Sequence, residues 1–261
     1  MINLPTISII TPSLNQGQFI EKAITSVIEQ NYPNLEYLVI DGGSEDSTLS
    51  ILKKYKNKIK YLSEKDKGQS DALNKGLSHT SGEIIGYLNS DDYLVPNCLL
   101  TVGKYFMDNK EAYWLTGKCH IVDAKDQEVR QAITLYKNSL LKYACSRTLF
   151  YIVQFISQPA TFWSRKVIKE VGNFDEKLYY NMDYDFWLRV WQKHKLYFID
   201  QYLASYRIHA VSKAMQSPQT QFKVAYEISR RYTRNPFFLW LNKLHAQIAV
   251  IAYEIDKSKH Q

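Results

Sequence analysis

The chain has 261 residues, of which 45% are hydrophobic and 23% are charged, and this composition excludes a disordered or fibrous protein. Its net charge of +7 favours an anionic partner, which can be nucleic acid, a lipid surface or a phosphorylated substrate. The three cysteines are far apart in the sequence, which argues against a disulfide framework or a zinc knuckle, so a reducing cytosol is the expected compartment.

Strands and helices are predicted to alternate over the first 95 residues. Short apolar runs at 7–10, 37–40, 59–62 and 84–88 predict strands, and apolar residues at helical spacing in 18–30, 46–55 and 70–77 predict helices. This alternation is typical of βαβ units with right-handed crossovers. We therefore expect an α/β fold with a mostly parallel sheet.

The later part of the chain is less regular. It predicts a helix at 96–109, a strand at 113–115, an aromatic-rich stretch of uncertain structure at 136–151, and helices at 184–193, 219–234 and 236–255. We expect one domain over residues 1–212, with a nucleotide-sugar half over about 1–95 and an acceptor half over about 96–212. A helical extension is expected over residues 213–261.

Polar residues follow the first, second and fourth predicted strands. They are Thr11-Pro12-Ser13-Leu14-Asn15, Asp41-Gly42-Gly43-Ser44 and Asn89-Ser90-Asp91-Asp92. In open parallel sheets, ligands bind at the carboxyl ends of the strands. The three turns are therefore predicted to share one rim and to form a binding site.

Two adjacent carboxylates, Asp91 and Asp92, end the fourth strand. Such a pair needs a neutralising cation or basic group, and Mg²⁺ or Mn²⁺ commonly takes one or two protein carboxylates together with water and substrate phosphate oxygens. The alternative is that the cluster caps the helix expected near Pro96, since Asn, Ser and Asp are all good caps.

Six sequence blocks in order resemble the inverting family-2 glycosyltransferases, which have the GT-A fold: a Rossmann-like, mostly parallel sheet flanked by helices. The blocks are TPSLN at 11–15, DGGSEDST at 41–48, EKDKGQSDALNKG at 64–76, LNSDD at 88–92, QPATFW at 158–163 and MDYDFWLRV at 182–190. The resemblance covers about residues 5 to 210. It implies transfer of a sugar, with inversion, from a nucleotide diphosphate-sugar to a hydroxyl of a glycan or lipid-linked acceptor.

The resemblance also implies roles for individual residues. Donor binding is assigned to Thr11, Pro12, Ser13, Asn15, Asp41, Gln69, Asn74, Asn89, Ser90 and Asp91, with Asp41 bonding the base. Metal binding, with Mn²⁺ or Mg²⁺, is assigned to Asp91 or Asp92, with His209 able to approach the metal or the diphosphate. Asn89 stands where many members have Asp, and Leu73 replaces an Arg, so one charge and one phosphate or base contact are missing.

Asp183 resembles the catalytic base of the family. Displacement at the anomeric carbon needs a carboxylate that removes the proton of the attacking hydroxyl. Asp185 is a competing candidate for this base, and a helix N-cap is the structural alternative for Asp183. Gln158, Pro159 and Thr161 resemble the segment beside the acceptor.

Three other functions fit less well. A nucleic-acid-binding protein is not favoured because the basic residues are scattered, and a dehydrogenase is not favoured because no GxGxxG is present. A non-catalytic nucleotide-sugar binder remains the alternative, and it would not need Asp183. We expect a cytoplasmic enzyme of polysaccharide or glycolipid synthesis, since neither a signal peptide nor a long apolar span is recognised. Basic and aromatic residues at 230–240 predict contact with the inner face of an anionic membrane, or equally a helix packed on the domain.

Overall fold

The computed structural model describes residues 4–259, with the side chains of residues 214 and 252–259 outside the description. An eight-stranded sheet with strand order β3-β2-β1-β4-β7-β6-β8-β5 forms its centre. The strands are β1 (Ile7–Ser13), β2 (Leu35–Asp41), β3 (Lys60–Ser63), β4 (Ile84–Tyr87), β5 (Tyr93–Leu94), β6 (Trp114–Val122), β7 (Thr161–Ser164) and β8 (Tyr197–Arg207). Strands β1 to β4 are parallel, whereas β7 runs antiparallel to both β4 and β6.

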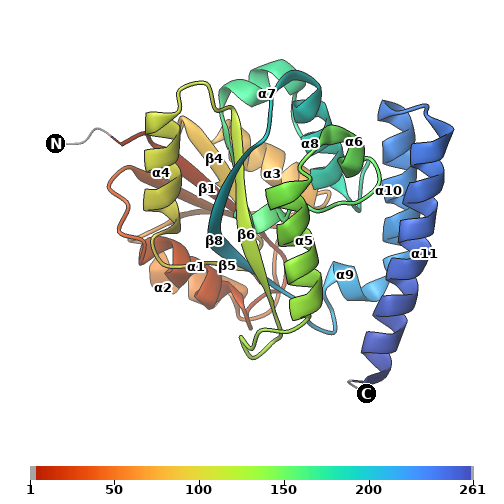
Figure 1. Ribbon diagram of the computed structural model, residues 1–261. Coiled ribbons are helices and arrows are strands. Elements are labelled where there is room, and N and C mark those ends of the chain that lie inside the picture. Colours follow the sequence, from red (N-terminus) through yellow and green to blue (C-terminus); the bar gives the residue numbers. More distant parts are fainter. Residues whose placement is uncertain (1–3, 260–261) are drawn as a thin grey trace.

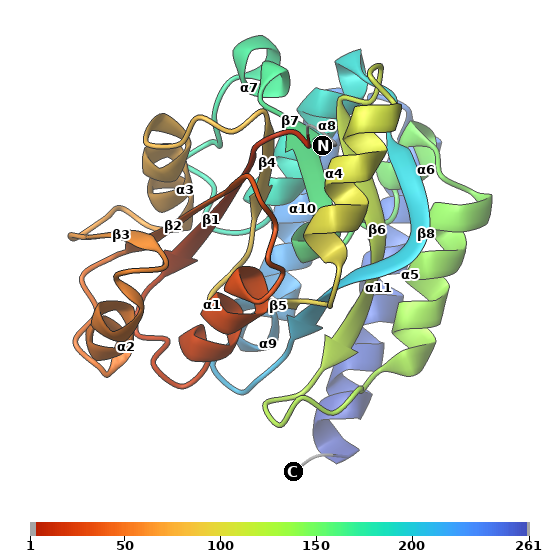
Figure 2. The same cartoon turned by 90° about the vertical axis from the view of Figure 1, so that its left-hand side faces the viewer.

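Helices cover both faces of this sheet (Figures 1 and 2). They are α1 (Ile20–Ile28), α2 (Thr48–Tyr55), α3 (Gln69–Ser78), α4 (Cys98–Asp108), α5 (Gln131–Tyr143), α6 (Arg147–Phe150), η1 (Gln158–Ala160), α7 (Lys166–Val171), α8 (Met182–Lys193), α9 (Lys213–Gln216), α10 (Pro218–Tyr232) and α11 (Pro236–Lys259). The apolar sides of α1, α2 and α4 pack in one buried cluster, and those of α3, α8 and α10 in another. The expected α/β fold, with its mostly parallel sheet, is confirmed.

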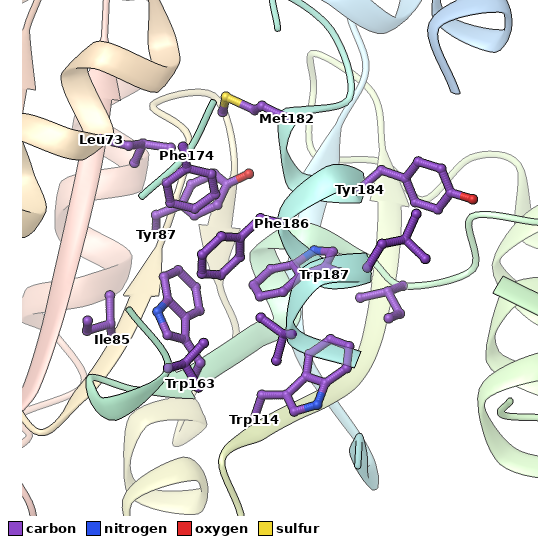
Figure 3. Close-up of a cluster of buried hydrophobic side chains, with 14 of the residues drawn as sticks. Leu73, Ile85, Tyr87, Trp114, Trp163, Phe174, Met182, Tyr184, Phe186 and Trp187 are labelled. Carbon is purple, nitrogen blue, oxygen red and sulfur yellow. The ribbon is translucent and has the colours of Figure 1, made fainter. Parts of the chain in front are cut away.

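The second cluster is rich in aromatic side chains between the sheet and α8 (Figure 3). The rings of Trp114 and Trp187 stack with centroids 5.5 Å apart, and Trp163 meets Trp187 edge-on at 5.2 Å. Phe174 stacks on Phe186 at 4.5 Å. Aromatic side chains bury large apolar areas, so this cluster fixes where α8 begins relative to the sheet.

Buried hydrogen bonds anchor the C-terminal helices to the domain. The Tyr184 hydroxyl donates to the Phe150 carbonyl (2.8 Å) and pairs with the Ser229 hydroxyl of α10 (2.7 Å). The Asn242 side chain of α11 donates to the Tyr151 carbonyl (2.8 Å). None of the helices within residues 4–259 is long and apolar enough to cross a membrane. The proposed division at residue 212 stays a prediction.

Several element boundaries differ from those expected. The helix at 96–109 begins at Cys98, because Asn97 has a left-handed φ of 63°. The strand at 113–115 continues to Val122, and the aromatic-rich stretch is largely helical. Helix α8 begins at Met182 after Asn181, whose φ is 58°, so Asp183 lies inside the first turn. The N-cap interpretation of Asp183 is therefore wrong.

Candidate active site

The turns after β1 and β2 are joined by hydrogen bonds. The backbone N–H of Asn15 donates to the Ser44 hydroxyl (2.7 Å), and the backbone N–H of Glu45 donates to the Asn15 side-chain oxygen (2.9 Å). The Ser13 hydroxyl oxygen is buried and has no hydrogen-bond partner within the described residues. Buried polar atoms normally have a partner, so this hydroxyl is suited to meet a ligand at the rim.

Asp41 ends β2 and is fully buried. Its carboxylate accepts hydrogen bonds from the hydroxyls of Ser44 and Ser63 and from the backbone N–H groups of Gly43 and Ser44. These donors compensate the cost of burying the carboxylate and fix the shape of the turn. Its contact with a nucleotide base stays a prediction.

Four other predicted donor-binding residues contribute mainly to the frame of the site. Thr11 and Pro12 are buried in β1, and Ser90 is buried in the turn after β4. The Asn74 amide donates to the Phe174 carbonyl (3.0 Å), and its oxygen accepts from the Phe174 N–H (3.0 Å). Asn74 therefore joins α3 to the segment before α8.

Asn89 is the centre of a side-chain network that crosses the site. Its oxygen accepts from the Gln69 amide (2.6 Å), and its own amide donates to the Gln158 oxygen (3.2 Å) and to Asp92 (3.1 Å). Lys213 extends this network, because its ammonium group donates to the Gln69 oxygen (3.0 Å). An amide both donates and accepts, which suits Asn89 to this central position better than a carboxylate, which only accepts.

The two carboxylates after β4 have different surroundings. Asp92 is buried, and it accepts from the backbone N–H of Arg207 (2.8 Å) and from the Asn89 amide. Burial, together with the charge of Asp91, raises the pKa of Asp92 well above its usual range. Asp92 thus ties the turn to β8, and both of its oxygens already have protein partners.

Asp91 lies beside His209, with 3.0 Å between the Asp91 Oδ2 and the His209 Nε2. The His209 ring packs on Phe19 with centroids 4.6 Å apart, and the Arg207 side chain donates to the Asp91 carbonyl (2.8 Å). Within the described residues there is no group of three or more His, Cys, Asp or Glu side chains that could hold a metal. Asp91 and His209 fit a site to which the protein gives two ligands and the donor phosphates and water give the rest.

Asp183 and Asp185 point in different directions. Asp183 is half-buried and accepts from the Tyr184 N–H (2.9 Å). Burial raises the pKa of Asp183, while the nearby charges of Lys137 and Lys213 lower it to a smaller extent. Asp185 is buried.

The partners of Asp185 are side chains of α8 and α10, among them the Arg231 guanidinium at 3.6 Å. Its carboxylate accepts from Arg189 (2.9 Å) and from the Tyr232 hydroxyl (2.9 Å). Asp185 therefore stabilises the packing of α8 against α10. Of the two carboxylates, Asp183 is the one whose surroundings suit a proton acceptor.

Lys137 and Lys213 are two residues of the site that the sequence analysis misses, whereas Asp66 lies in a block that it marks. Asp66 packs so closely on Gly42 that a Cβ there would lie 2.7 Å from its carboxylate. Asp66 itself lies in the block at 64–76 that resembles the family, so the sequence marked this residue. Lys137 and Lys213 lie outside every block, and no pattern marks them.

The family model for glycosyl transferase family 2 matches residues 8–172, more than half of the chain. The chain belongs to this family. The family-2 match includes the turns after β1, β2 and β4, which form the rim. The sheet with helices on both faces is the expected GT-A fold.

Relatives of this family-2 glycosyltransferase carry the same general description. An uncharacterized glycosyltransferase of Rickettsia prowazekii is 31% identical over 209 residues, which are 79% of this chain and 65% of the relative. One from Haemophilus influenzae is 29% identical over 99% of this chain and 83% of the relative. The chain spans about two thirds or less of the length of several of these relatives.

Two solved structures share the fold. Staphylococcus aureus TarS 1–349 in complex with UDP-GlcNAc has a TM-score of 0.65 at 22% identity, over 85% of this chain and 65% of that one. The mannosyltransferase PcManGT from Pyrobaculum calidifontis, in complex with GDP-Man and Mn²⁺, has a TM-score of 0.70 at 17% identity, over 94% and 70%. At this level of identity the likeness establishes the fold.

Proposed function

We propose that this glycosyltransferase moves a sugar from a nucleotide diphosphate-sugar to an acceptor hydroxyl in one displacement that inverts the anomeric centre. The observation that carries the proposal is the placement of Asp183 and the Asp91–His209 pair around Lys213, whose charge interacts with both Asp183 and Asp91. A single carboxylate base suits direct displacement by the acceptor. A non-catalytic binder has no use for a base at this position.

The donor is proposed to lie along the rim formed by the turns after β1, β2 and β4. Ser13 offers an unpaired hydroxyl there, and Gln69 and Lys213 offer donors to oxygen atoms. Lys213 has carboxylates of Asp66, Asp91 and Asp183 around it, so it can hold phosphate close to the metal ligands. The UDP-GlcNAc and GDP-Man complexes of the two structural neighbours support a donor of this class.

Asp91 and His209 are the residues proposed to hold a divalent cation, Mn²⁺ or Mg²⁺. When bound, such an ion stabilises the negative charge that develops on the leaving diphosphate. Asp183 accepts the proton of the acceptor hydroxyl, and Lys213 stabilises charge on the donor side of this carboxylate. Asp92 and Asn89 keep the turn after β4 in place.

A screen of nucleoside diphosphates tests the donor site. At about a hundredfold excess over its Kd, a ligand raises the free energy of unfolding by about 2.7 kcal/mol. We expect one of UDP, GDP and dTDP to raise the thermal midpoint of the protein in the presence of Mn²⁺, and the matching nucleotide-sugar to be hydrolysed slowly. The nucleosides alone serve as controls. A protein that none of the three diphosphates stabilises would contradict the proposed function.

The C-terminal helices are proposed to lie on the inner face of a membrane that presents a lipid-linked acceptor. Along α11 the exposed apolar side chains are Phe237, Trp240, Leu244, Ile248 and Ile251. Their spacing places them along one side of the helix. Arg230, Arg231 and Arg234 lie nearby in the sequence and can meet anionic headgroups. This location supports a role in cell-surface polysaccharide or glycolipid synthesis.

Vesicle flotation tests the membrane proposal. We expect the full chain to float with vesicles that contain phosphatidylserine, and the double variant Phe237→Ser, Trp240→Ser to remain largely in the soluble fraction. Both side chains are more than half exposed, so the variant should keep the fold. The matched control is Leu135→Ser, Tyr143→Ser on α5, which removes two exposed apolar side chains away from α11. Equal flotation of the two double variants would rule the proposal out.

A further inference from the structure

One face of α5 carries polar side chains that have no hydrogen-bond partner among the described residues. Thr134, Lys137 and Asn138 are three and four positions apart, so they lie on the same side of the helix. This helix packs on β6 and β8 (Figure 2). The Thr134 hydroxyl and the Asn138 amide nitrogen are buried without a hydrogen-bond partner anywhere in the described chain. Since an unpaired buried polar group costs about 1–3 kcal/mol, a ligand is a natural complement to this face.

Lys137 brings a positive charge from this face to the proposed base. Its ammonium group has no hydrogen bond or ion pair among the residues that the structure describes. Burial lowers the pKa of Lys137, and the charges that oppose this effect come from Cys119 and Asp183. The interaction is mutual, because the charge of Lys137 also acts on the pKa of Asp183. Lys137 therefore interacts electrostatically with Asp183 but forms no hydrogen bond or ion pair with it in the described chain.

Lys213 also interacts with Asp183, and most of its other side-chain contacts are with residues of the donor rim. Its ammonium group donates to Gln69 and lies 4.3 Å from the centre of the Tyr179 ring, and its charge interacts with Asp66 and Asp91. Those two carboxylates belong to the donor rim, whereas the surroundings of Lys137 belong to α5 and β6. Both lysines therefore act on Asp183, Lys213 from among the residues of the donor rim and Lys137 from α5.

We propose that Lys137, together with Thr134 and Asn138, binds an anionic group of the acceptor, a phosphate or a carboxylate, next to the hydroxyl that attacks. This inference rests on the proposed function. The acceptor hydroxyl must reach Asp183 while the donor fills the side of Lys213, so the acceptor approaches along α5. An ammonium, a hydroxyl and an amide together offer the hydrogen-bond donors that an oxyanion needs.

Calorimetric binding of three matched ligands tests the proposal. They are methyl glucoside, methyl glucoside 6-phosphate and methyl glucuronide, each titrated into the full chain saturated with Mn²⁺ and the nucleoside diphosphate that stabilises it. Wild type should bind at least one of the charged ligands about tenfold more tightly than the neutral one, the value of one charge-assisted contact. Whichever charged ligand binds more tightly separates a phosphate from a carboxylate.

Variants assign that preference to Lys137. Lys137→Gln should abolish the preference, and Lys137→Arg should keep most of it because the charge remains. Lys104→Gln removes the same charge from an exposed position on α4 and should leave the preference unchanged. A purely structural role, or an action of Lys137 on Asp183 alone, would change the affinities of charged and neutral ligands equally.

Two results would overturn the inference: equal affinity of wild type for the three ligands, including no measurable binding of any, or a preference that survives in Lys137→Gln. If the nucleoside diphosphates also fail to stabilise the protein, the proposed function fails with it. If they stabilise the protein and the nucleotide-sugar is hydrolysed, only the inference about the acceptor is lost.

Discussion

Replacing Asp183 by Asn is expected to reduce sugar transfer by about 10²–10⁴-fold, the usual contribution of a positioned general base. The amide keeps the shape of the side chain and can still accept from the Tyr184 N–H, but it cannot take up the proton of the acceptor. Binding of the nucleoside diphosphate should change little, because the proposed donor position is beside Lys213 and the rim. Initial rates of transfer and the thermal midpoint with bound diphosphate measure the two effects separately.

The pH dependence gives an independent reading of the same residue. Burial raises the pKa of Asp183, so its carboxyl stays protonated to a higher pH than an exposed Asp does. Since only the ionised form can act as a base, transfer in wild type should rise with pH through this raised pKa and then level off. The rise should be absent from the residual activity of Asp183→Asn. An unchanged pH profile in the variant would exclude Asp183 as the base.

Asp185→Asn is the matched comparison, since it changes the same chemical group two residues away. Asp185 is buried and paired with Arg189 and with the Tyr232 hydroxyl, so the variant leaves the mostly buried Arg189 guanidinium without its carboxylate. We expect the free energy of unfolding to fall by about 3–5 kcal/mol. Transfer per folded molecule should stay near the wild-type rate. Asp108→Asn, at an exposed position on α4, controls for net charge.

Much of the fold follows from local patterns in the first half of the chain. The run Ile7–Ile10 is mostly apolar and is buried on both faces, as a central parallel strand requires, and it lies between β2 and β4. The parallel order of β1 to β4 then brings the turns after β1, β2 and β4 to one rim. The predicted meeting of Asn15 with the turn after β2, and of Asn89 with Gln69, depends only on this topology.

The parts that escaped prediction depend on packing between distant segments. The sequence does not distinguish the roles of Asp91 and Asp92. The position of Arg207 on β8 joins the buried Asp92 to that strand and leaves Asp91 beside His209. The position of Lys137 depends on the tertiary contact of α5 with β6. The sequence of the aromatic-rich segment does not indicate that contact, because the contact joins residues far apart in the chain.

Replacing Asp91 by Asn is the second change with a large expected effect. If Asp91 and His209 hold the divalent cation, the variant loses one charged ligand, and transfer should fall by about a hundredfold or more, because metal stabilisation of the leaving group is worth several kcal/mol. Stability without ligands should change little, since the Asp91 side chain is partly exposed and its carboxylate contacts only His209 among the hydrogen bonds described.

A metal titration measures this effect without relying on turnover. In wild type, Mn²⁺ should increase the stabilisation that the nucleoside diphosphate gives, because ion and phosphate bind the same site and each favours the other. In Asp91→Asn that increase should be small or absent, while the stabilisation by diphosphate alone remains. The remote variant Asp108→Asn should behave as wild type. A full Mn²⁺ effect in Asp91→Asn would show that the cation, if it binds, is held by other groups, and would remove the Asp91–His209 pair from the proposed mechanism.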